Sequence, residues 1–442
     1  MKVRLVKLPL FFVLGQKFIY SGPHMVKEID ALLKRLFPIC RSITGNGVRK
    51  TLSIIRTHVP LKIKEVPTGT KVFDWTVPKE WNIKDAYIKD PSGEKIVDFK
   101  KNNLHIVGYS IPVNTKMKLS GLKKHLHSIP EKPSIIPYKT SYYKENWGFC
   151  VTHEQLTSLK DGTYEVVIDS SLKDGSLTYG ELLIPGKSKD EVLISCGICH
   201  PSMANDSLSG VVLATLLAKE LLKKKGRYSY RFLFIPETIG AIVWLAGNKT
   251  GAKRIKHGLV ATCLGDSGQF NYKKSRAGNA SIDTAVEKAL KDSKMPYSIL
   301  DYWPTGSDER QFNSPGFSLP IGSLMRSVYG HFPEYHTSGD NLDFVKGKYV
   351  EETLRLYAEV IFILENDALC TSRNPFCEPQ LGPRGLYDDH HPEEFVISLL
   401  WLANYSDGKN TLLDIANIAD QPFRAVQAAA ESLEKVGFLR LG

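Results

Sequence analysis

The sequence predicts an α/β protein built on a doubly wound sheet, with a β-rich insertion and a helical C-terminal module. Apolar strand-like runs alternate with amphipathic helices between residues 176 and 375, which is typical of a sheet with helices on both faces. Short strand-like pieces separated by Gly, Pro and Asp fill residues 72–175. We therefore expect a main domain at 26–71 and 176–375, an insertion at 72–175 and a winged-helix domain at 385–442.

The first 25 residues are expected to be an extension or a tag. The apolar run Leu8–Leu14 follows three basic residues, but no convincing small-residue cleavage site comes after it. It is also far shorter than the roughly 20 apolar residues that cross a bilayer. Gly22–Met25 has the sequence of a cloning linker, so we expect the natural protein to begin at Met25.

The elements of the main domain and the insertion can be placed in order. Two amphipathic helices are expected between Val26 and His58, with a turn-rich loop at Ser42–Gly47. Insertion strands are predicted at Ala86–Lys89, Lys95–Phe99, Leu104–Tyr109 and Glu165–Asp169. Main-domain strands are predicted at Glu181–Pro185, Glu191–Ser195, Arg231–Ile235 and Leu259–Leu264, with a helix at Ser209–Lys223. The C-terminal helices are predicted at Pro392–Asn404, Thr411–Ile418 and Pro422–Val436, followed by a wing strand after Gly437.

Composition and charge narrow the class of protein. Hydrophobic residues make up 42% of the chain and charged residues 24%, which is typical of a globular protein with a sizeable core. The formal net charge is +11, but Lys and Arg occur in short runs without interleaved aromatic residues, as on a solvated surface. The seven cysteines are irregularly spaced and suggest no disulfide framework. We therefore expect a cytoplasmic protein that does not enter a membrane.

Residues suited to metal binding follow the predicted strands. His200 and Asp206 come after the strand that ends near residue 195. Glu237 and Asp266 follow the next two strands, and His336 comes after a long loop-rich stretch. Any one of them alone is typical of a cap or a turn, but five in these places favour a shared site. Open α/β sheets bind ligands beyond the carboxyl ends of their strands, and zinc prefers His and Asp.

Five motifs resemble those of the co-catalytic zinc aminopeptidase superfamily. They are His200–Gly210, Pro236–Gly240, Gly265–Asp266, Gly306–Asp308 and Tyr335–Asp340. With Asp74–Trp81 and Trp147–Cys150 added, the chain from about Val26 onward resembles the bacterial aminopeptidase-like proteins of that superfamily. Those proteins are often associated with polysaccharide gene clusters and carry a β-rich insertion and a C-terminal winged helix. The resemblance implies a zinc-aminopeptidase-like doubly wound mixed sheet.

The resemblance also implies a role for each motif residue. His200 matches the first zinc ligand, Asp206 the Asp that bridges two zinc ions, and Asp266 a further ligand of the first ion. His336 matches the closing ligand of the second ion. Glu237 matches the general base that acts on the metal-bound water.

One departure from the family pattern concerns the number of zinc ions. The family usually has two consecutive Glu residues, a base and then a ligand, whereas this chain has Glu237-Thr238. Threonine is a poor zinc ligand beside a carboxylate. Three arrangements stay open: a single zinc binds, Glu237 is diverted to coordination, or Glu334 takes the place of the missing ligand.

Several residues near the motifs are candidates for substrate binding. Arg310, Arg326 and Tyr335 are candidates for binding a substrate carboxylate or sugar oxygens, while surface or inter-domain ion pairs are equally good explanations of the arginines. Three tryptophans of the insertion are expected to be core residues, with closure of the cleft as the alternative: Trp75, Trp81 and Trp147.

The function predicted from these observations is zinc-dependent, aminopeptidase-like hydrolysis of an amide bond in a small peptide-like or N-acylated substrate. Metal-bound hydroxide would attack the carbonyl, and Glu237 would pass the proton to the leaving amine. One alternative is an amino-sugar deacylase of polysaccharide metabolism. The other is a catalytically decayed binding or regulatory protein that uses the winged helix.

The composition of the C-terminal helix at Pro422–Lys435 indicates whether the winged helix binds nucleic acid. It carries Arg424 and Lys435, but also Glu431, Glu434 and much Ala. A helix that reads bases in a groove usually presents more Arg, Lys, Asn or Gln. We therefore expect the winged helix to make docking or homo-oligomer contacts and not to bind nucleic acid.

Overall fold

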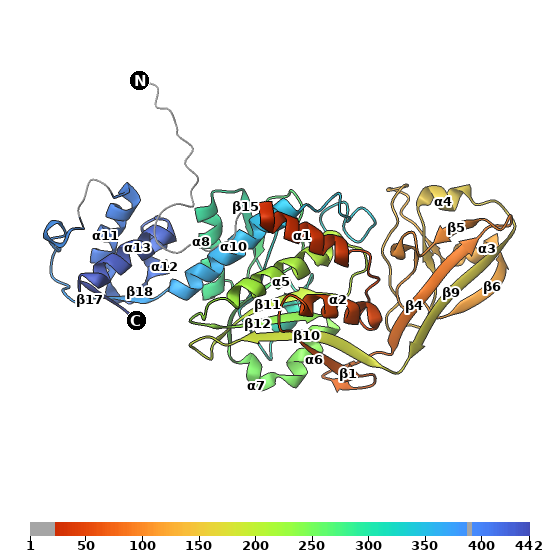
Figure 1. Ribbon diagram of the computed structural model, residues 1–442, viewed down its shortest axis with the longest axis horizontal. Coiled ribbons are helices and arrows are strands. Elements are labelled where there is room, and N and C mark those ends of the chain that lie inside the picture. Colours follow the sequence, from red (N-terminus) through yellow and green to blue (C-terminus); the bar gives the residue numbers. More distant parts are fainter. Residues whose placement is uncertain (1–22, 387–390) are drawn as a thin grey trace, which may run out of the picture. The chain divides into compact units, whose positions relative to one another are not determined.

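The computed structural model describes residues 23–386 and 391–442, so the part of the predicted extension at 1–22 lies outside the described residues. The described chain forms two compact units, Pro23–Ile361 and Phe362–Gly442 (Figure 1). The long helix α10, Gly347–Asn366, runs from the first unit into the second.

The first unit is built on an eight-stranded mixed sheet in the order β1-β10-β12-β11-β13-β16-β14-β15. The parallel strands β12, β11, β13 and β16 form its centre, and β1 and β10 extend it antiparallel. Its strands are β1 Lys62–Pro67, β10 Ser176–Ile184, β11 Glu191–Gly197, β12 Ser229–Ile235, β13 Ile255–Val260, β14 Phe270–Lys273, β15 Tyr297–Leu300 and β16 Ile321–Met325. This mixed sheet confirms the predicted fold class.

Helices of the first unit bury broad apolar faces against this sheet. In α5, Gly210–Leu221, nearly every residue is buried, and the helix contacts both β11 and β12. Gly210 is required at its start, because a Cβ there would stand 2.0 Å from the carbonyl oxygen of Ala261. The other helices are α1 Pro23–Leu36, α2 Asn46–Arg56, α6 Ile239–Gly247, α7 Lys249–Ala252, α8 Ser281–Ser293 and α9 Glu309–Phe312.

The insertion is a four-stranded antiparallel sheet in the order β5-β4-β9-β6. Its strands are β4 Glu80–Lys89, β5 Lys95–Asp98, β6 Val113–Lys118 and β9 Thr163–Lys173. The predicted strand Leu104–Tyr109 is wrong, because the Asn102 side chain accepts a hydrogen bond from the Leu104 N–H and starts a 3-10 turn, η1 Asn103–His105. The remaining short elements are β2 Lys71–Val72, β3 Trp75–Thr76, α3 Leu119–Leu122, η2 Lys123–His125, β7 Leu126–His127, β8 Phe149–Cys150 and α4 His153–Ser158.

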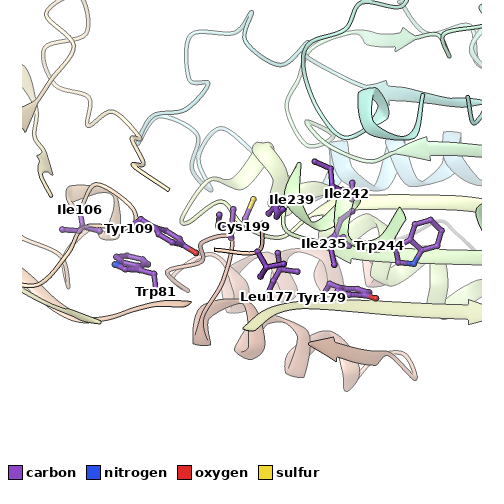
Figure 2. Close-up of a cluster of buried hydrophobic side chains, with 14 of the residues drawn as sticks. Trp81, Ile106, Tyr109, Leu177, Tyr179, Cys199, Ile235, Ile239, Ile242 and Trp244 are labelled. Carbon is purple, nitrogen blue, oxygen red and sulfur yellow. The ribbon is translucent and has the colours of Figure 1, made fainter. Parts of the chain in front are cut away.

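A single hydrophobic cluster joins the insertion to the main sheet (Figure 2). Trp81 and Tyr109 lie at its insertion end, with their rings stacked 5.8 Å apart. Ile235 and Trp244 lie at its sheet end, with Cys199 between the two groups in Figure 2. The shared core means that the insertion is held against the carboxyl ends of the central strands.

In its described residues, the second unit contains the α-helices α11, α12 and α13 and a three-stranded sheet in the order β18-β17-β19. Its elements are β17 Leu369–Ser372, η4 Gly382–Arg384, α11 Glu393–Tyr405, β18 Asp407–Thr411, α12 Leu412–Ile418, α13 Phe423–Lys435 and β19 Leu439–Leu441. The helices share a core that includes Leu399, Ile415 and Leu433. The sheet includes β17, which lies before the predicted segment 385–442.

Two further features concern the whole described chain. No helix within residues 23–386 and 391–442 is long and apolar enough to cross a membrane. All seven cysteines are free thiols.

Candidate metal centre

Three side chains with metal-ligating atoms converge just beyond the carboxyl end of β11. His200 follows that strand, Asp206 lies in the irregular helical turn η3, Ala204–Ser209, before α5, and His336 lies in the loop after β16. The Nε2 atom of His336 is 3.0 Å from Oδ2 of Asp206, and Nδ1 of His200 is 4.0 Å from Oδ1 of Asp206. One ligand atom from each residue lies within 4.8 Å of the other two.

The protonation states of His200 and Asp206 suit a cation. Burial lowers the pKa of His200 to about 4, so its imidazole is neutral near pH 7. Burial opposes ionisation of Asp206, but His200 and His336 overcome this effect and hold its pKa at about 2. A neutral imidazole and an ionised carboxylate are the forms that bind a metal.

The donor set fits zinc. Two imidazole nitrogens and one carboxylate oxygen are ligand types that zinc prefers, and three protein ligands leave a position for water or substrate. Cys199, His200 and Glu237 form a second converging group. Burial and the nearby Glu237 raise the pKa of the Cys199 thiol well above its usual range, so a metal that binds there has to displace a proton from this thiol. The site around Asp206 is therefore the better candidate.

Asp340 holds the ligand segment in place. Its Oδ1 accepts a hydrogen bond from the Asn205 N–H at 2.5 Å, and its Oδ2 accepts one from the Asp206 N–H at 2.9 Å. Thr262 donates its hydroxyl to Oδ1 of Asp206 at 3.2 Å. Asp340 ends the motif Tyr335–Asp340, but its role cannot be predicted from the sequence, because only the fold brings it to the backbone of a segment 134 residues away.

Asp266 lies outside the converging group of ligand atoms. The predicted strand Leu259–Leu264 in fact ends at Val260, since the N–H groups of Cys263 and Gly265 donate to the backbone and side-chain oxygens of Asn205. This turn carries Asp266 away from the sheet edge. Its Oδ2 accepts from the Asn205 amide at 2.8 Å, and its Oδ1 accepts from the Ser327 hydroxyl at 2.7 Å. Both carboxylate oxygens are thus occupied.

Glu237 stands beside the centre at the end of β12. Its Oε2 is 3.8 Å from Nδ1 of His200, and its side chain is 20% exposed. Burial, with Asp206 and Asp308 nearby, raises the pKa of Glu237 well above its usual range. A carboxyl group in such a place can exchange a proton with a bound substrate or water. Of the alternatives for the missing ligand, Glu334 belongs to neither converging group among the described residues.

Thr238 is not available as a metal ligand, because its hydroxyl group is engaged in a hydrogen bond within the protein. Its N–H donates to Oδ1 of Asp308 at 2.7 Å, and its hydroxyl accepts a hydrogen bond from Nη2 of Arg310 at 2.8 Å. A guanidinium group thus lies next to the residue that follows Glu237. The buried Nε of Arg310 has no hydrogen-bond acceptor within the described chain.

The two other predicted substrate-binding residues are placed differently. Tyr335 stacks on His336, with ring centroids 4.0 Å apart and planes at 10°. Arg326 is 3% exposed and donates to the Gly268 carbonyl at 2.8 Å and to the Thr353 hydroxyl at 3.1 Å. Arg326 therefore ties the loop after Asp266 to α10.

The insertion contributes two tyrosines that sequence reasoning missed. The ring of Tyr138 packs edge-on against both His200 and His336, at centroid distances of 5.5 and 5.3 Å. Its hydroxyl is 3.0 Å from that of Tyr142. The Tyr138 N–H donates to the His336 carbonyl at 2.8 Å, which fixes one ligand from the insertion. The only sequence signal was the tyrosine-rich stretch 138–143.

The three tryptophans of the insertion have different surroundings. Trp81 is buried and donates its indole N–H to the Ser110 carbonyl at 2.9 Å. Trp147 stacks on His125 with centroids 3.6 Å apart. Trp75 is 38% exposed and meets Tyr143 edge-on. Trp81 is thus a core residue.

Comparison with known families shows which family the chain belongs to. Residues 30–367 match a family described as a domain of unknown function, DUF4910, and residues 368–441 match a winged helix-turn-helix family. The chain belongs to the DUF4910 family. A relative of this DUF4910 protein in Clostridium acetobutylicum is 55% identical over 431 residues, which are 96% of this chain and 99% of the relative. It is provisionally named a polysaccharide biosynthesis protein with an aminopeptidase-like domain.

Solved structures give the same result for the fold. A Clostridium acetobutylicum crystal structure, provisionally described as a peptidase, is 55% identical with a TM-score of 0.91, covering 95% of this DUF4910 chain and 97% of the other. A zinc aminopeptidase of Bacillus subtilis has a TM-score of 0.57 at 11% identity, covering 79% and 96% of the two chains. The predicted resemblance to aminopeptidase-like proteins with a C-terminal winged helix is confirmed.

Proposed function

We propose that this protein is a zinc-dependent hydrolase of amide bonds that works with one zinc ion. The observation that carries the proposal is the convergence of His200, Asp206 and His336 beside the buried carboxyl group of Glu237. One ion is proposed because Thr238 and Asp266 are engaged in other hydrogen bonds. The kinship with aminopeptidase-like proteins supports a peptidase-like reaction.

Each group near the ligands has a task in this proposal. When bound, zinc supplies Lewis acidity to a substrate carbonyl and to a water molecule. Glu237 takes the proton of that water and passes it to the leaving amine. Burial and neighbouring acids hold a proton on Glu237 in the free protein, and a nearby cation favours the ionised form that a base needs.

Arg310 and Tyr335 are proposed to bind the substrate. The Arg310 guanidinium donates one hydrogen bond to Thr238, and no carboxylate of the described residues lies within ion-pair distance of it. A guanidinium with free donors suits a substrate carboxylate, such as the end of a short peptide. Tyr138, which packs on His200, and its neighbour Tyr142 are proposed to limit the site to small substrates.

A second candidate keeps the reaction and changes the substrate to an N-acylated amino sugar. It is favoured by the name of the Clostridium acetobutylicum relative, which refers to polysaccharide biosynthesis. The cleavage of either amide uses the same Lewis acid and the same base, so only a substrate test separates the two candidates.

The test is a screen of the zinc-loaded protein against aminoacyl-arylamides and N-acetylated amino sugars. We expect turnover of one class, and Glu237→Gln should slow it by about 10²–10⁴-fold with unchanged zinc content. Glu334→Gln is the matched control, because Glu334 lies in the loop of His336 but outside the converging groups. If Glu237→Gln is as fast as the wild type, Glu237 is not the base.

A further inference from the structure

A groove lies between the loop that joins α1 to α2 and the insertion. It consists of two cavities of about 580 and 160 Å³ that share four lining residues, Cys40, Asn46, Gly47 and Ile83. The larger cavity falls within the range of small-molecule sites, roughly 300–1,000 Å³. Ser202 and Ser338, each two residues after a proposed ligand, also line it.

The charged side chains that line the groove are all positive. Four lysines line the two cavities, Lys50, Lys84, Lys100 and Lys101, and no Asp or Glu does. Lys100 pairs with Asp85 at 3.0 Å. The other three form no ion pair within the described residues. A groove with several cations and no carboxylate attracts an anionic ligand.

The groove is also rich in amide side chains. Asn46, Asn82, Asn102, Asn103 and Asn341 line it. Asn103 is 8% exposed, and its Oδ1 has no hydrogen-bond donor within the described chain. A buried acceptor without a donor is uncommon and marks a place for a hydroxyl group or a water molecule. The amides of Asn82 and Asn341 donate and accept within the protein. Among the described residues this leaves Nδ2 of Asn46 and Asn102 as donors and Oδ1 of Asn103 as an acceptor for ligand hydroxyl groups.

The start of α2 adds a further anion-binding element. Gly45 has no side chain to cap this helix. The Asn46 N–H donates to Oδ1 of Asn82 at 2.7 Å, whereas the N–H of Gly47 donates to no acceptor within the described chain. Gly47 lines both cavities, and a Cβ there would stand 1.9 Å from the Cys40 carbonyl oxygen. A free N–H group at a helix start favours negative charge.

We propose that this groove binds an anionic carbohydrate, a short chain of sugars that carry carboxylate or phosphate groups. The lysines and the Gly47 N–H would hold the charged groups, and Asn46, Asn102 and Asn103 would hold the hydroxyl groups. The proposal is independent of the metal centre and of the reaction proposed above.

The test uses the full chain and a fluorescent tetragalacturonate, with maltotetraose as the neutral probe. The acidic probe should bind, less tightly as salt rises, and the neutral probe should not. Lys50→Glu with Lys101→Glu should weaken binding by about tenfold or more. Lys187→Glu with Lys189→Glu, the same charge change on the exposed turn before β11, should leave it within about twofold.

A second variant tests whether Asn103 faces the bound anion. Asn103→Asp keeps the shape of the side chain and adds a negative charge to the groove, so it should weaken the acidic probe as well. Thermal melting curves show whether each variant is folded. The proposal is overturned if the acidic probe does not bind, if maltotetraose binds as tightly, or if the groove variants behave like the control. A single-stranded oligonucleotide of equal charge that competes as well as tetragalacturonate would also overturn it.

Discussion

At the scale of single residues, hydrogen bonds decide what a buried carboxylate can do. Asp206 and Asp266 are both nearly fully buried, and both follow strands of the same sheet. Asp206 accepts a hydrogen bond from Thr262 as well, but its carboxylate faces the imidazoles of His200 and His336, two groups that can share a cation with it. Both oxygens of Asp266 accept hydrogen bonds from Asn205, Gly268 or Ser327. The sequence motifs show that both residues are aspartates. Only their neighbours in the fold distinguish a metal ligand from a structural hydrogen-bond acceptor.

Asp308 provides a pH-dependent prediction. This carboxyl group is 1% exposed, and burial, opposed by the Thr238 N–H and assisted by Glu309, raises its pKa from 3.8 to about 7. Between about pH 4 and 7 the native state keeps this proton and the unfolded state loses it. The Asp308 contribution to the free energy of unfolding therefore falls as pH rises through that window.

We expect Asp308→Asn to stabilise the metal-free protein at pH 8 by ~1–3 kcal/mol and to have little effect at pH 4. The amide oxygen can still accept the Thr238 N–H, so the variant removes the charge and keeps this contact. Urea unfolding at the two pH values measures the difference. An equal effect at both pH values would show that Asp308 does not titrate in this window.

At the scale of elements, the local hydrophobic pattern of the sequence predicted the bounds of some strands and helices well and of others poorly. The strand β11 and the helix α5 were predicted nearly to the residue, because both are buried along their length and their apolar patterns are strong. The end of β13 was not, because Asn205, far away in sequence, draws the following turn off the sheet. The placement of His336 beside Tyr138 depends on the insertion in the same way.

The two ends of the central strands carry different kinds of polar group. The candidate centre lies at the carboxyl ends, whereas the amino ends of β11 and β12 carry a buried ion-pair network. Glu191 is 1% exposed and binds Arg231 at 2.5 Å and Arg254 at 2.8 Å. Burial opposes the ionisation of Glu191, and the two arginines nevertheless hold its pKa below its usual range.

We expect Glu191→Gln to lower the free energy of unfolding by ~3–5 kcal/mol, because it leaves the buried Arg231 without part of its counter-charge. Glu145→Gln, in an exposed pair with Lys79, should cost less than ~1 kcal/mol. Denaturant unfolding followed by circular dichroism measures both. The zinc affinity of the folded Glu191→Gln protein should equal that of the wild type. A large loss of zinc affinity would show that the ion-pair network and the candidate metal centre are coupled.

At the scale of the whole molecule, charge separates the two units. Residues 362–442 contain 12 Asp and Glu against 6 Lys and Arg, although the full chain carries a net charge of +11. An acidic winged helix is poorly suited to the phosphate backbone of DNA. Protein docking or homo-oligomer contacts therefore remain the prediction for this unit.

We expect the C-terminal helix to contribute nothing to DNA binding. Any weak binding of mixed-sequence DNA by the basic first unit should be the same in the wild type and in Arg424→Glu, because Arg424 is the basic residue at the start of α13. Fluorescence anisotropy at two salt concentrations measures this. A salt-sensitive affinity that falls several-fold in Arg424→Glu would indicate nucleic-acid recognition by the winged helix.

We propose that His200, Asp206 and His336 hold one zinc ion. The zinc content of the purified protein tests this proposal most directly. Elemental analysis of zinc-loaded, desalted protein should find about one ion per chain in the wild type. His200→Ala and His336→Ala should lose it. Asp266→Asn and the exposed His331→Ala should keep it. Equal zinc in His200→Ala and the wild type, or its loss from Asp266→Asn alone, would contradict the account.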